Sequence, residues 1–257
     1  MIITNLLHED FTSSMLQDLP ISQIQQDCSE FLSNPALLLR GVSENEAGAY
    51  AANPHIRKDR RSLSGRHIGT AIFNEAFEVE FGFERVRNQC LFVTNSVDTA
   101  HKYGEMYYVL PVNGSKVASK EGVADSIHLV GNSWYDFTDT LKQYMSKEEK
   151  NAFAKAGMDM NLHTPNIPED WFDQLLNTLT DDNQDKAHYI MTKIQERMME
   201  AYVVENVNSI GGSQFPIEYM MFNADRYWMI HAEMLSQSVR TSNYTRAWEK
   251  LIQVLKG

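Results

Sequence analysis

The chain has 257 residues, of which 43% are hydrophobic and 22% charged, values typical of a globular protein with a sizeable buried core. Its 34 acidic and 23 basic residues give a formal net charge of −11, and such a surface repels phosphate backbones. We therefore expect neither a general nucleic-acid partner nor binding to an anionic membrane. Two cysteines, Cys28 and Cys90, are too few for a disulfide framework or a cysteine zinc cluster.

Features of localisation and metal binding are also missing from the sequence. No apolar run approaches the roughly 20 residues of a membrane span. The first residues, MIITNLLHEDF, lack the basic and long apolar regions of a secretory signal. We expect a reducing, cytoplasmic setting, and a protein packaged inside a virus particle would have the same composition. None of the 8 histidines is paired with another histidine or a cysteine at metal-ligand spacing, so we expect no metal site.

The first part of the chain alternates between helical patterns and polar segments. Residues 1–32 have helical spacing, and the apolar run 36–39 predicts a buried strand that stops at Arg40. The polar stretch 53–69 is basic in an otherwise acidic chain, and loops of this length tend to be functional or disordered. The apolar positions of 70–81 fit one face of a helix.

Two strands with a short helix between them are predicted next. Residues 90–94 (CLFVT) and 105–111 (EMYYVLP) are rich in β-branched and aromatic residues. Between them, 96–103 predicts a helix with Ser96 as its N-cap and Gly104 after its end.

The second half begins with a helical region and ends with strands. Residues 134–205 have a helical pattern, which we interpret as an insertion or subdomain within a single domain of residues 1–257. Residues 217–222 and 226–230 predict two strands, and 244–255 a terminal helix. Strands near both ends with helices between them indicate an α+β fold whose sheet is completed late in the sequence.

Two basic features are candidates for binding phosphate. Arg40 closes a buried strand, so its guanidinium is either paired in a structural ion pair or faces a cleft. The loop arginines Arg60 and Arg61 form either a solvated charge run or a clamp on phosphate oxygens, which the guanidinium fork matches.

Two further features suggest the rest of a site. In the block 90–104, Phe92 and Tyr103 either pack in the core or line a cleft with an aromatic wall. Glu218 enters an apolar strand, where a lone carboxylate is costly to bury. It therefore lies at a strand end in solvent or faces a polar cleft, where it would stabilise developing positive charge.

Taken in order, these segments resemble the ADP-ribosyltransferase family. The residues LLRG (38–41) resemble its first motif, an arginine or histidine followed by glycine at a strand end. The segment LFVTNSVDTAHKYG (91–104) resembles the "IYFAD…SANYC" block of the poly(ADP-ribose) polymerase branch without a gap, and its turn Thr94-Asn95-Ser96 resembles the Ser-Thr-Ser motif of the toxin-like branch. The residues IEYMMF (217–222) resemble the "NEYIVY" strand. Many uncharacterised phage proteins are similar, with an LYRG-type start, a basic Arg-rich loop and a late Glu strand.

The resemblance implies a split β-sheet core with a helical insertion and flanking terminal helices. It implies NAD as substrate, no metal, and transfer of ADP-ribose to a protein acceptor, which for a phage protein is a host protein. Glu218 falls on the catalytic glutamate. Pro216 stands where the toxin branch often has the Glu or Gln that positions an acceptor side chain, so an arginine acceptor is not implied.

Further roles in binding NAD follow from the same resemblance. Arg40, followed by Gly41, falls on the residue that binds the diphosphate or the adjoining ribose. Tyr103 and Phe92 fall on the aromatic residues around the nicotinamide. Other expected contributors are Thr94 and Ser96, which would orient Arg40 or Glu218, and Arg60 and Arg61, which would close over the phosphates or select the acceptor.

Three other functions fit the same residues. A non-catalytic module on this fold would retain NAD or ADP-ribose, or act as an interaction protein in a virion. An NAD glycohydrolase would release nicotinamide with no acceptor present. A structural α+β protein would have Arg40 and Glu218 far apart.

Overall fold

The chain forms two compact units, which we name the sheet unit (residues 1–56, 90–124 and 202–257) and the helical unit (57–89 and 125–201). The computed structural model describes residues 19–42, 50–51, 67–121, 123, 127–163, 167–168, 170–210, 215–224, 226–238 and 243–257. The loop arginines Arg60 and Arg61, and residues 1–18 of the predicted N-terminal helical stretch, lie outside the described residues.

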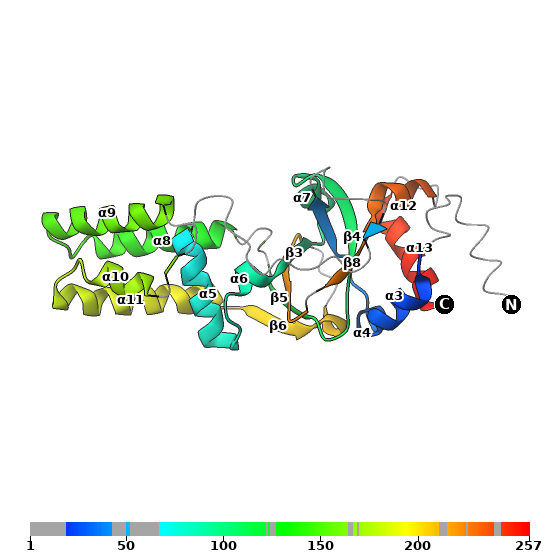
Figure 1. Ribbon diagram of the computed structural model, residues 1–257, viewed down its shortest axis with the longest axis horizontal. Coiled ribbons are helices and arrows are strands. Elements are labelled where there is room, and N and C mark those ends of the chain that lie inside the picture. The colour runs from blue at the N-terminus through cyan, green and yellow to red at the C-terminus, as the bar shows by residue number, and fades with distance from the viewer. Residues whose placement is uncertain are drawn as a thin grey trace. The chain divides into compact units, whose positions relative to one another are not determined.

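The described part of the sheet unit contains an eight-stranded sheet in the order β2-β8-β4-β1-β3-β7-β5-β6 (Figure 1). All neighbouring strands are antiparallel. The strands are β1 (Leu39–Val42), β2 (Tyr50–Ala51), β3 (Leu91–Thr94), β4 (Glu105–Pro111), β5 (Lys116–Lys120), β6 (Tyr202–Asn206), β7 (Glu218–Phe222) and β8 (Tyr227–His231). A mixed fold with an antiparallel sheet confirms the predicted α+β class.

Helices from both ends of the chain cover part of this sheet. The helices of the sheet unit are α3 (Ile21–Asp27), α4 (Ser29–Ser33), α7 (Val97–His101), α12 (Ala232–Ser238) and α13 (Tyr244–Lys256), with a 3₁₀ turn at Val207–Ser209. The ring of Tyr108 on β4 stacks on Trp248 of α13 with centroids 5.4 Å apart, and its hydroxyl donates to the Tyr244 carbonyl at 2.6 Å. Trp248 also contacts Phe31 of α4, so this aromatic cluster joins the terminal helices to the sheet.

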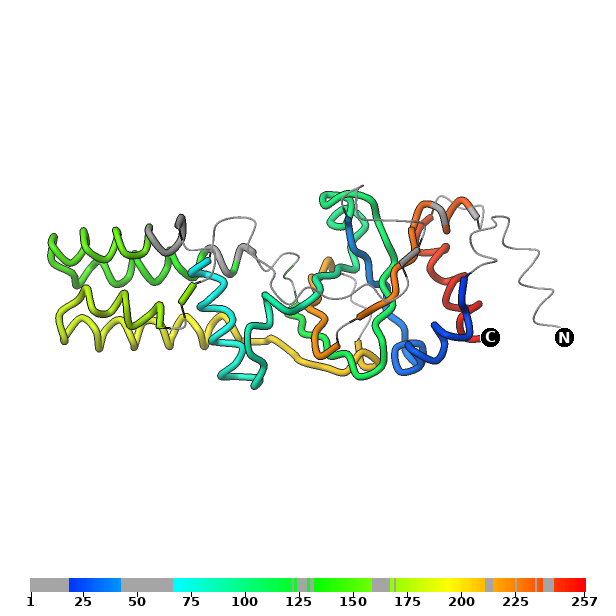
Figure 2. The backbone as a smooth tube through the Cα atoms, in the orientation of Figure 1, coloured from blue at the N-terminus to red at the C-terminus, as the bar shows by residue number. Residues whose placement is uncertain are grey.

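The helical unit packs around aromatic side chains. Its helices are α5 (His67–Phe81), α6 (Val86–Gln89), α8 (Ile127–Leu141), α9 (Lys147–His163), α10 (Trp171–Leu176) and α11 (Asp181–Met199). Helices α8 to α11 run alongside one another, and α5 crosses them (Figures 1 and 2). Trp134 and Phe153 stack with centroids 5.9 Å apart, and the buried Phe137 contacts both rings.

Several predicted elements are confirmed. Strand β4 covers the predicted residues 105–111, and α7 begins after Ser96, whose Oγ accepts from Thr99 N at 3.2 Å as an N-cap. Helix α13 buries the apolar face predicted for the C-terminal helix. The first strand, predicted at 36–39, lies at 39–42, because its pairing with β4 begins at Leu39 and continues through Gly41.

Three strands were not predicted. One is β2 at residues 50–51, which pairs with β8. Residues 202–206 form β6, where the sequence pattern indicates helix, and residues 116–120 form β5. These strands pair with each other from Lys116 opposite Asn206 to Lys120 opposite Tyr202. Because the pairing satisfies backbone groups of segments about 90 residues apart, the local pattern carries little trace of it.

Two kinds of feature are absent from the described ranges. None of the helices there is long and apolar enough to cross a membrane. The same residues contain no group of three or more His, Cys, Asp or Glu side chains placed to hold a metal ion.

A carboxylate at the start of α9 connects three segments of the helical unit. Glu149 accepts from Ser146 N at 2.8 Å while Ser146 Oγ accepts from Glu149 N at 3.1 Å, the reciprocal bonds of a capping box. The other Glu149 oxygen accepts from Thr180 N at 2.9 Å and from Asn183 Nδ2 at 3.0 Å. These hydrogen bonds, that from Thr180 N first, hold the pKa of Glu149 far below its ordinary 4.5.

We predict that Glu149→Gln lowers the thermal unfolding midpoint, because an amide cannot accept all these bonds. Since folding lowers the pKa of Glu149, its contribution is fully present above about pH 4.5 and is lost as the pH falls toward the folded-state pKa. The difference in midpoint between wild type and Glu149→Gln, measured by circular dichroism, should therefore shrink on acidification. The control is Glu148→Gln, an exposed neighbour, which should melt like the wild type. Equal midpoints for both variants at pH 7 would contradict this role.

Candidate functional site

Three strands bring the predicted site residues together at one end of β3. Thr94, the last residue of β3, lies opposite Leu39 of β1 and opposite Glu218, the first residue of β7. At the usual spacing of neighbouring strands, the backbones at Leu39 and Glu218 are about 10 Å apart. Arg40 and Glu218, which are 178 positions apart in the sequence, are therefore separated by one strand. The alternative with the two residues on distant parts of the fold is thus wrong for the backbone, although their Cβ atoms lie on opposite faces of the sheet.

The Arg40 guanidinium lies where β1 and β3 separate. Leu39 is paired with Thr94, whereas Gly41 is paired with Met106 of β4 and has no partner on β3 within these described strands. In place of a backbone N–H from β1, Arg40 Nη1 donates to the Phe92 carbonyl at 3.1 Å. Arg40 is half-buried, and among the described residues it forms no ion pair with a carboxylate. The structural ion pair that the sequence left open is thus not found in this part of the chain.

Alternation along the strands places the predicted residues on two faces. Thr94 and Glu218 are a registered pair and share a face with Phe92, two residues before Thr94. Arg40 follows Leu39, the partner of Thr94, so the Cβ of Arg40 points to the opposite face of the sheet. Its guanidinium nevertheless reaches the Phe92 carbonyl in the space between the two strands.

Helix α7 lies close against β1 at Gly41. A Cβ built on Gly41 would be 2.0 Å from the Ala100 carbonyl oxygen and 2.8 Å from Tyr103 Cβ. Tyr103 follows α7 and is 58% exposed, so the alternative that it packs in the core is wrong. Phe92 is half-buried. An exposed aromatic ring is thereby held beside the residue that follows Arg40.

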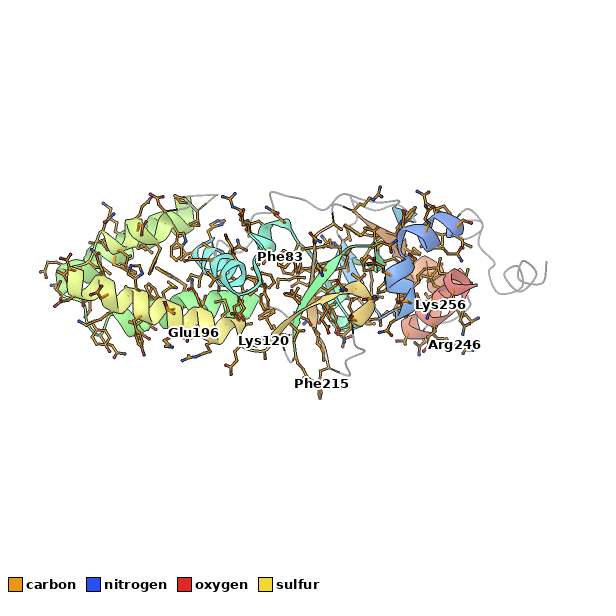
Figure 3. The ribbon with its side chains drawn as sticks, turned by 90° about the horizontal axis from the view of Figure 1, so that it is seen from below. Phe83, Lys120, Glu196, Phe215, Arg246 and Lys256 are labelled. Carbon is orange, nitrogen blue, oxygen red and sulfur yellow. The ribbon has the colours of Figure 1, made fainter. Side chains whose placement is uncertain are left out.

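The turn from β3 into α7 is bonded to the start of β7. Thr94 is buried, and its Oγ1 accepts from Ser96 N at 3.1 Å. Asn95 Oδ1 accepts from Ile217 N at 2.8 Å, and Asn95 Nδ2 donates to the Phe215 carbonyl at 2.9 Å. The Phe215 side chain itself projects away from the strands (Figure 3). These bonds fix the position of the half-buried Glu218, the first residue of β7, relative to the turn.

Asn95 was not singled out from the sequence. Its amide bonds segments more than 100 positions apart, and the only available signal was its place in the Thr-Asn-Ser turn.

A second set of polar residues, also missed, shares the Arg40 face. Arg40, Tyr107 of β4 and His231 of β8 lie in one row across three strands. Glu105 accepts from the Tyr107 hydroxyl at 3.4 Å, and His231 Nε2 lies 3.2 Å from the same oxygen, Oε2. Burial, and then the charge of Glu105, raises the pKa of Tyr107 to about 12. Tyr107 therefore stays protonated at neutral pH and donates to the carboxylate.

In comparisons with known proteins, no family model, no curated protein and no solved structure matches this chain. The functional argument therefore rests on the geometry of these residues.

We predict that Gly41→Ala destabilises the chain by about 2–3 kcal/mol, because the new methyl group meets a backbone carbonyl of α7 that cannot rotate away. Urea unfolding measures the loss in free energy of unfolding. The control Thr99→Ala, on α7 itself, should cost no more than about 0.5 kcal/mol. A Gly41→Ala protein as stable as this control would show that α7 is not held against β1.

Proposed function

We propose that the sheet unit has an ADP-ribosyltransferase fold, binds NAD, and transfers its ADP-ribose group to a protein acceptor. The observation that carries the proposal is the Arg40 guanidinium, half-buried at the separation of β1 and β3, with a carbonyl as its partner and no carboxylate partner among the described residues. A guanidinium has five N–H donors, so this one has several left to bind an anion. The diphosphate of NAD is such an anion.

The neighbouring residues suit the other parts of the dinucleotide. Tyr103 offers an exposed ring beside Gly41, on which the nicotinamide would stack. Glu218, one strand beyond Thr94, would accept hydrogen bonds from hydroxyls of the nicotinamide ribose. Thr94 and Ser96 hold the turn between these groups by their own hydrogen bond. Arg60 and Arg61 remain expected contributors in the basic loop.

The chemistry requires a carboxylate close to the ribose. The bond between C1′ of the ribose and the nicotinamide nitrogen breaks, and its electron pair leaves with neutral nicotinamide. Positive charge spreads over C1′ and the ring oxygen, and the Glu218 carboxylate would stabilise this charge more in the transition state than in the bound substrate. A nucleophilic atom of the acceptor then bonds to C1′ and loses its proton. This chemistry needs no disulfide, and both cysteines are buried thiols outside any disulfide, as a reducing cytoplasmic setting allows.

We predict that Glu218→Gln lowers the rate of nicotinamide release from NAD at least about a hundredfold, because the amide keeps the shape and removes the charge. The rate is measured with radiolabelled NAD, with and without a lysate that supplies protein acceptors. Glu249→Gln, an exposed change on α13, should leave it unchanged. Turnover of Glu218→Gln at the wild-type rate would exclude the assigned role.

The same assay separates the alternatives in the wild type. Label transferred to protein supports the transferase, nicotinamide released without acceptor indicates a glycohydrolase, and NAD retained without turnover indicates a binding module. Neither binding nor turnover would reject the proposed function altogether.

We predict that Arg40→Ala weakens NAD binding about tenfold or more, since it removes a charge-assisted contact to the diphosphate. Calorimetric titration with NAD measures the effect, and urea unfolding measures the stability of the same preparation. Arg246→Ala, which removes an exposed arginine of α13 (Figure 3), is the matched control and should bind NAD normally. Loss of stability with unchanged affinity for NAD would instead assign Arg40 a structural role.

A further inference from the structure

The residues immediately before β7 decide where Glu218 enters the sheet. Residues 215–217 belong to no helix or strand, and Glu218 is the first residue of β7. A carboxylate that stabilises a developing charge must be held to within about 0.5 Å of its productive position. Irregular backbone at the end of a strand does not give that precision by itself, so the contacts of 215–217 matter for the proposed chemistry.

The side chain of Asn95 continues the pairing of β3 with β7 beyond its last pair, Thr94 with Glu218. The antiparallel register next brings Asn95 opposite Ile217, and Asn95 N donates to the Ile217 carbonyl at 3.4 Å. The return bond from Ile217 N, at 2.8 Å, goes to Asn95 Oδ1, and Asn95 Nδ2 donates to the Phe215 carbonyl at 2.9 Å. One amide thus holds two backbone groups of the segment before Glu218.

A second contact holds the same backbone from the other side of β7. Glu218 N donates to the Val123 carbonyl at 2.9 Å, and Val123 follows β5, which neighbours β7 on the side opposite β3. Glu218 therefore enters the sheet between two neighbours. The bond to Val123 joins backbone groups, whereas the Asn95 amide belongs to a side chain. A substitution can therefore remove the amide and leave the backbone contacts in place.

Helix α7 is held by contacts of other residues. Thr94 Oγ1 accepts from Ser96 N at 3.1 Å, Ser96 caps the helix, and the close approach at Gly41 holds α7 against β1. Tyr103, which follows α7, therefore keeps its place when the Asn95 side chain is shortened. Loss of the amide should displace the carboxylate and spare the aromatic ring.

We propose that Asn95 is a positioning residue for Glu218. Its amide fixes the backbone that places the carboxylate, and it acts on the reaction through that carboxylate. The inference rests on the proposed function, because it assigns Asn95 a part in the same site. Since the Glu218 carboxylate stabilises charge that develops in the transition state, a loss of its position lowers kcat and leaves the KM for NAD nearly unchanged.

Asn113 provides a matched control at the other end of β7. Asn113 Nδ2 donates to the Gln26 carbonyl at 2.9 Å, and Asn113 Oδ1 accepts from Glu30 N at 2.9 Å. The next residue, Gly114, accepts from Asn223, which follows the last residue of β7. The Asn113 amide therefore makes the same two kinds of backbone bond in the sheet unit, but away from the candidate site.

The test compares Asn95→Ala with Asn113→Ala in the full chain, with nicotinamide release from radiolabelled NAD as the assay. Neither residue has a positive φ, so alanine fits both backbones. Asn95→Ala should lower kcat at least about tenfold and change the KM for NAD less than about twofold. Asn113→Ala should keep the wild-type kcat, and thermal melts measure the stability that each variant loses. A wild-type kcat for Asn95→Ala would overturn the role.

A double-mutant cycle separates positioning from a general loss of structure. In the Glu218→Gln background the group that Asn95 places is already gone, so Asn95→Ala should lower the remaining rate less than about twofold. The same loss in both backgrounds would show that Asn95 acts on the fold as a whole. Asn95→Asp keeps the acceptor for Ile217 N and loses the donor to the Phe215 carbonyl, so its kcat should lie between those of the wild type and Asn95→Ala.

Hydrogen exchange gives a readout that needs no NAD. Peptides that cover 215–222, analysed by mass spectrometry, should exchange faster in Asn95→Ala than in the wild type or Asn113→Ala, because Ile217 N loses its acceptor. Unchanged exchange would overturn the role whatever the kinetics. A wild type that does not turn over NAD would reject the proposed function and this role together, whereas normal wild-type turnover with an unaffected Asn95→Ala would reject this role alone.

Discussion

The hydrogen bond from Arg40 to the Phe92 carbonyl is the interaction on which the candidate site depends. It occurs where β1 remains paired with β4 but separates from β3. There a side chain replaces the backbone N–H that a continuous pairing of β1 with β3 would supply. A charged donor satisfies one carbonyl in this way, but a neutral acceptor offsets only part of the free-energy cost of half-burying a guanidinium. An anion beside Arg40 would complete that compensation, and this is the physical argument for the proposed contact with the diphosphate.

The surrounding backbone places the other groups relative to this arginine. Because a side chain at position 41 would collide with the Ala100 carbonyl, glycine lets α7 approach β1 and bring Tyr103 with it. Asn95 connects the same turn to the residues before Glu218 through two amide hydrogen bonds. The aromatic ring, the turn hydroxyls and the carboxylate are thereby tied to neighbouring strands, and a site built on such rigid elements is better pre-organised than one built on loops.

Part of this arrangement could be predicted from the sequence, and the division has a physical reason. The strand at 105–111 and the capped helix after Ser96 are set by local patterns, and both were predicted. The presence of Arg40 and Glu218 on nearby strands could be proposed only from the order of the motifs. The contact of Glu105 with His231 required the pairing of β4 with β8, which joins positions 126 apart and leaves no local signal. Long-range pairing likewise explains why β5 and β6 escaped prediction.

The charge of the whole chain constrains the proposed NAD site. A net charge of −11 repels a dinucleotide, whose diphosphate is itself an anion, so a local cation at the site is a physical requirement for binding NAD. Arg40 is such a cation, and the basic loop that contains Arg60 and Arg61 adds positive charge to the same chain. The same negative field attracts a basic polypeptide and raises its rate of encounter. Under the proposed function, the chain therefore needs strong local positive charge only where it holds its nucleotide.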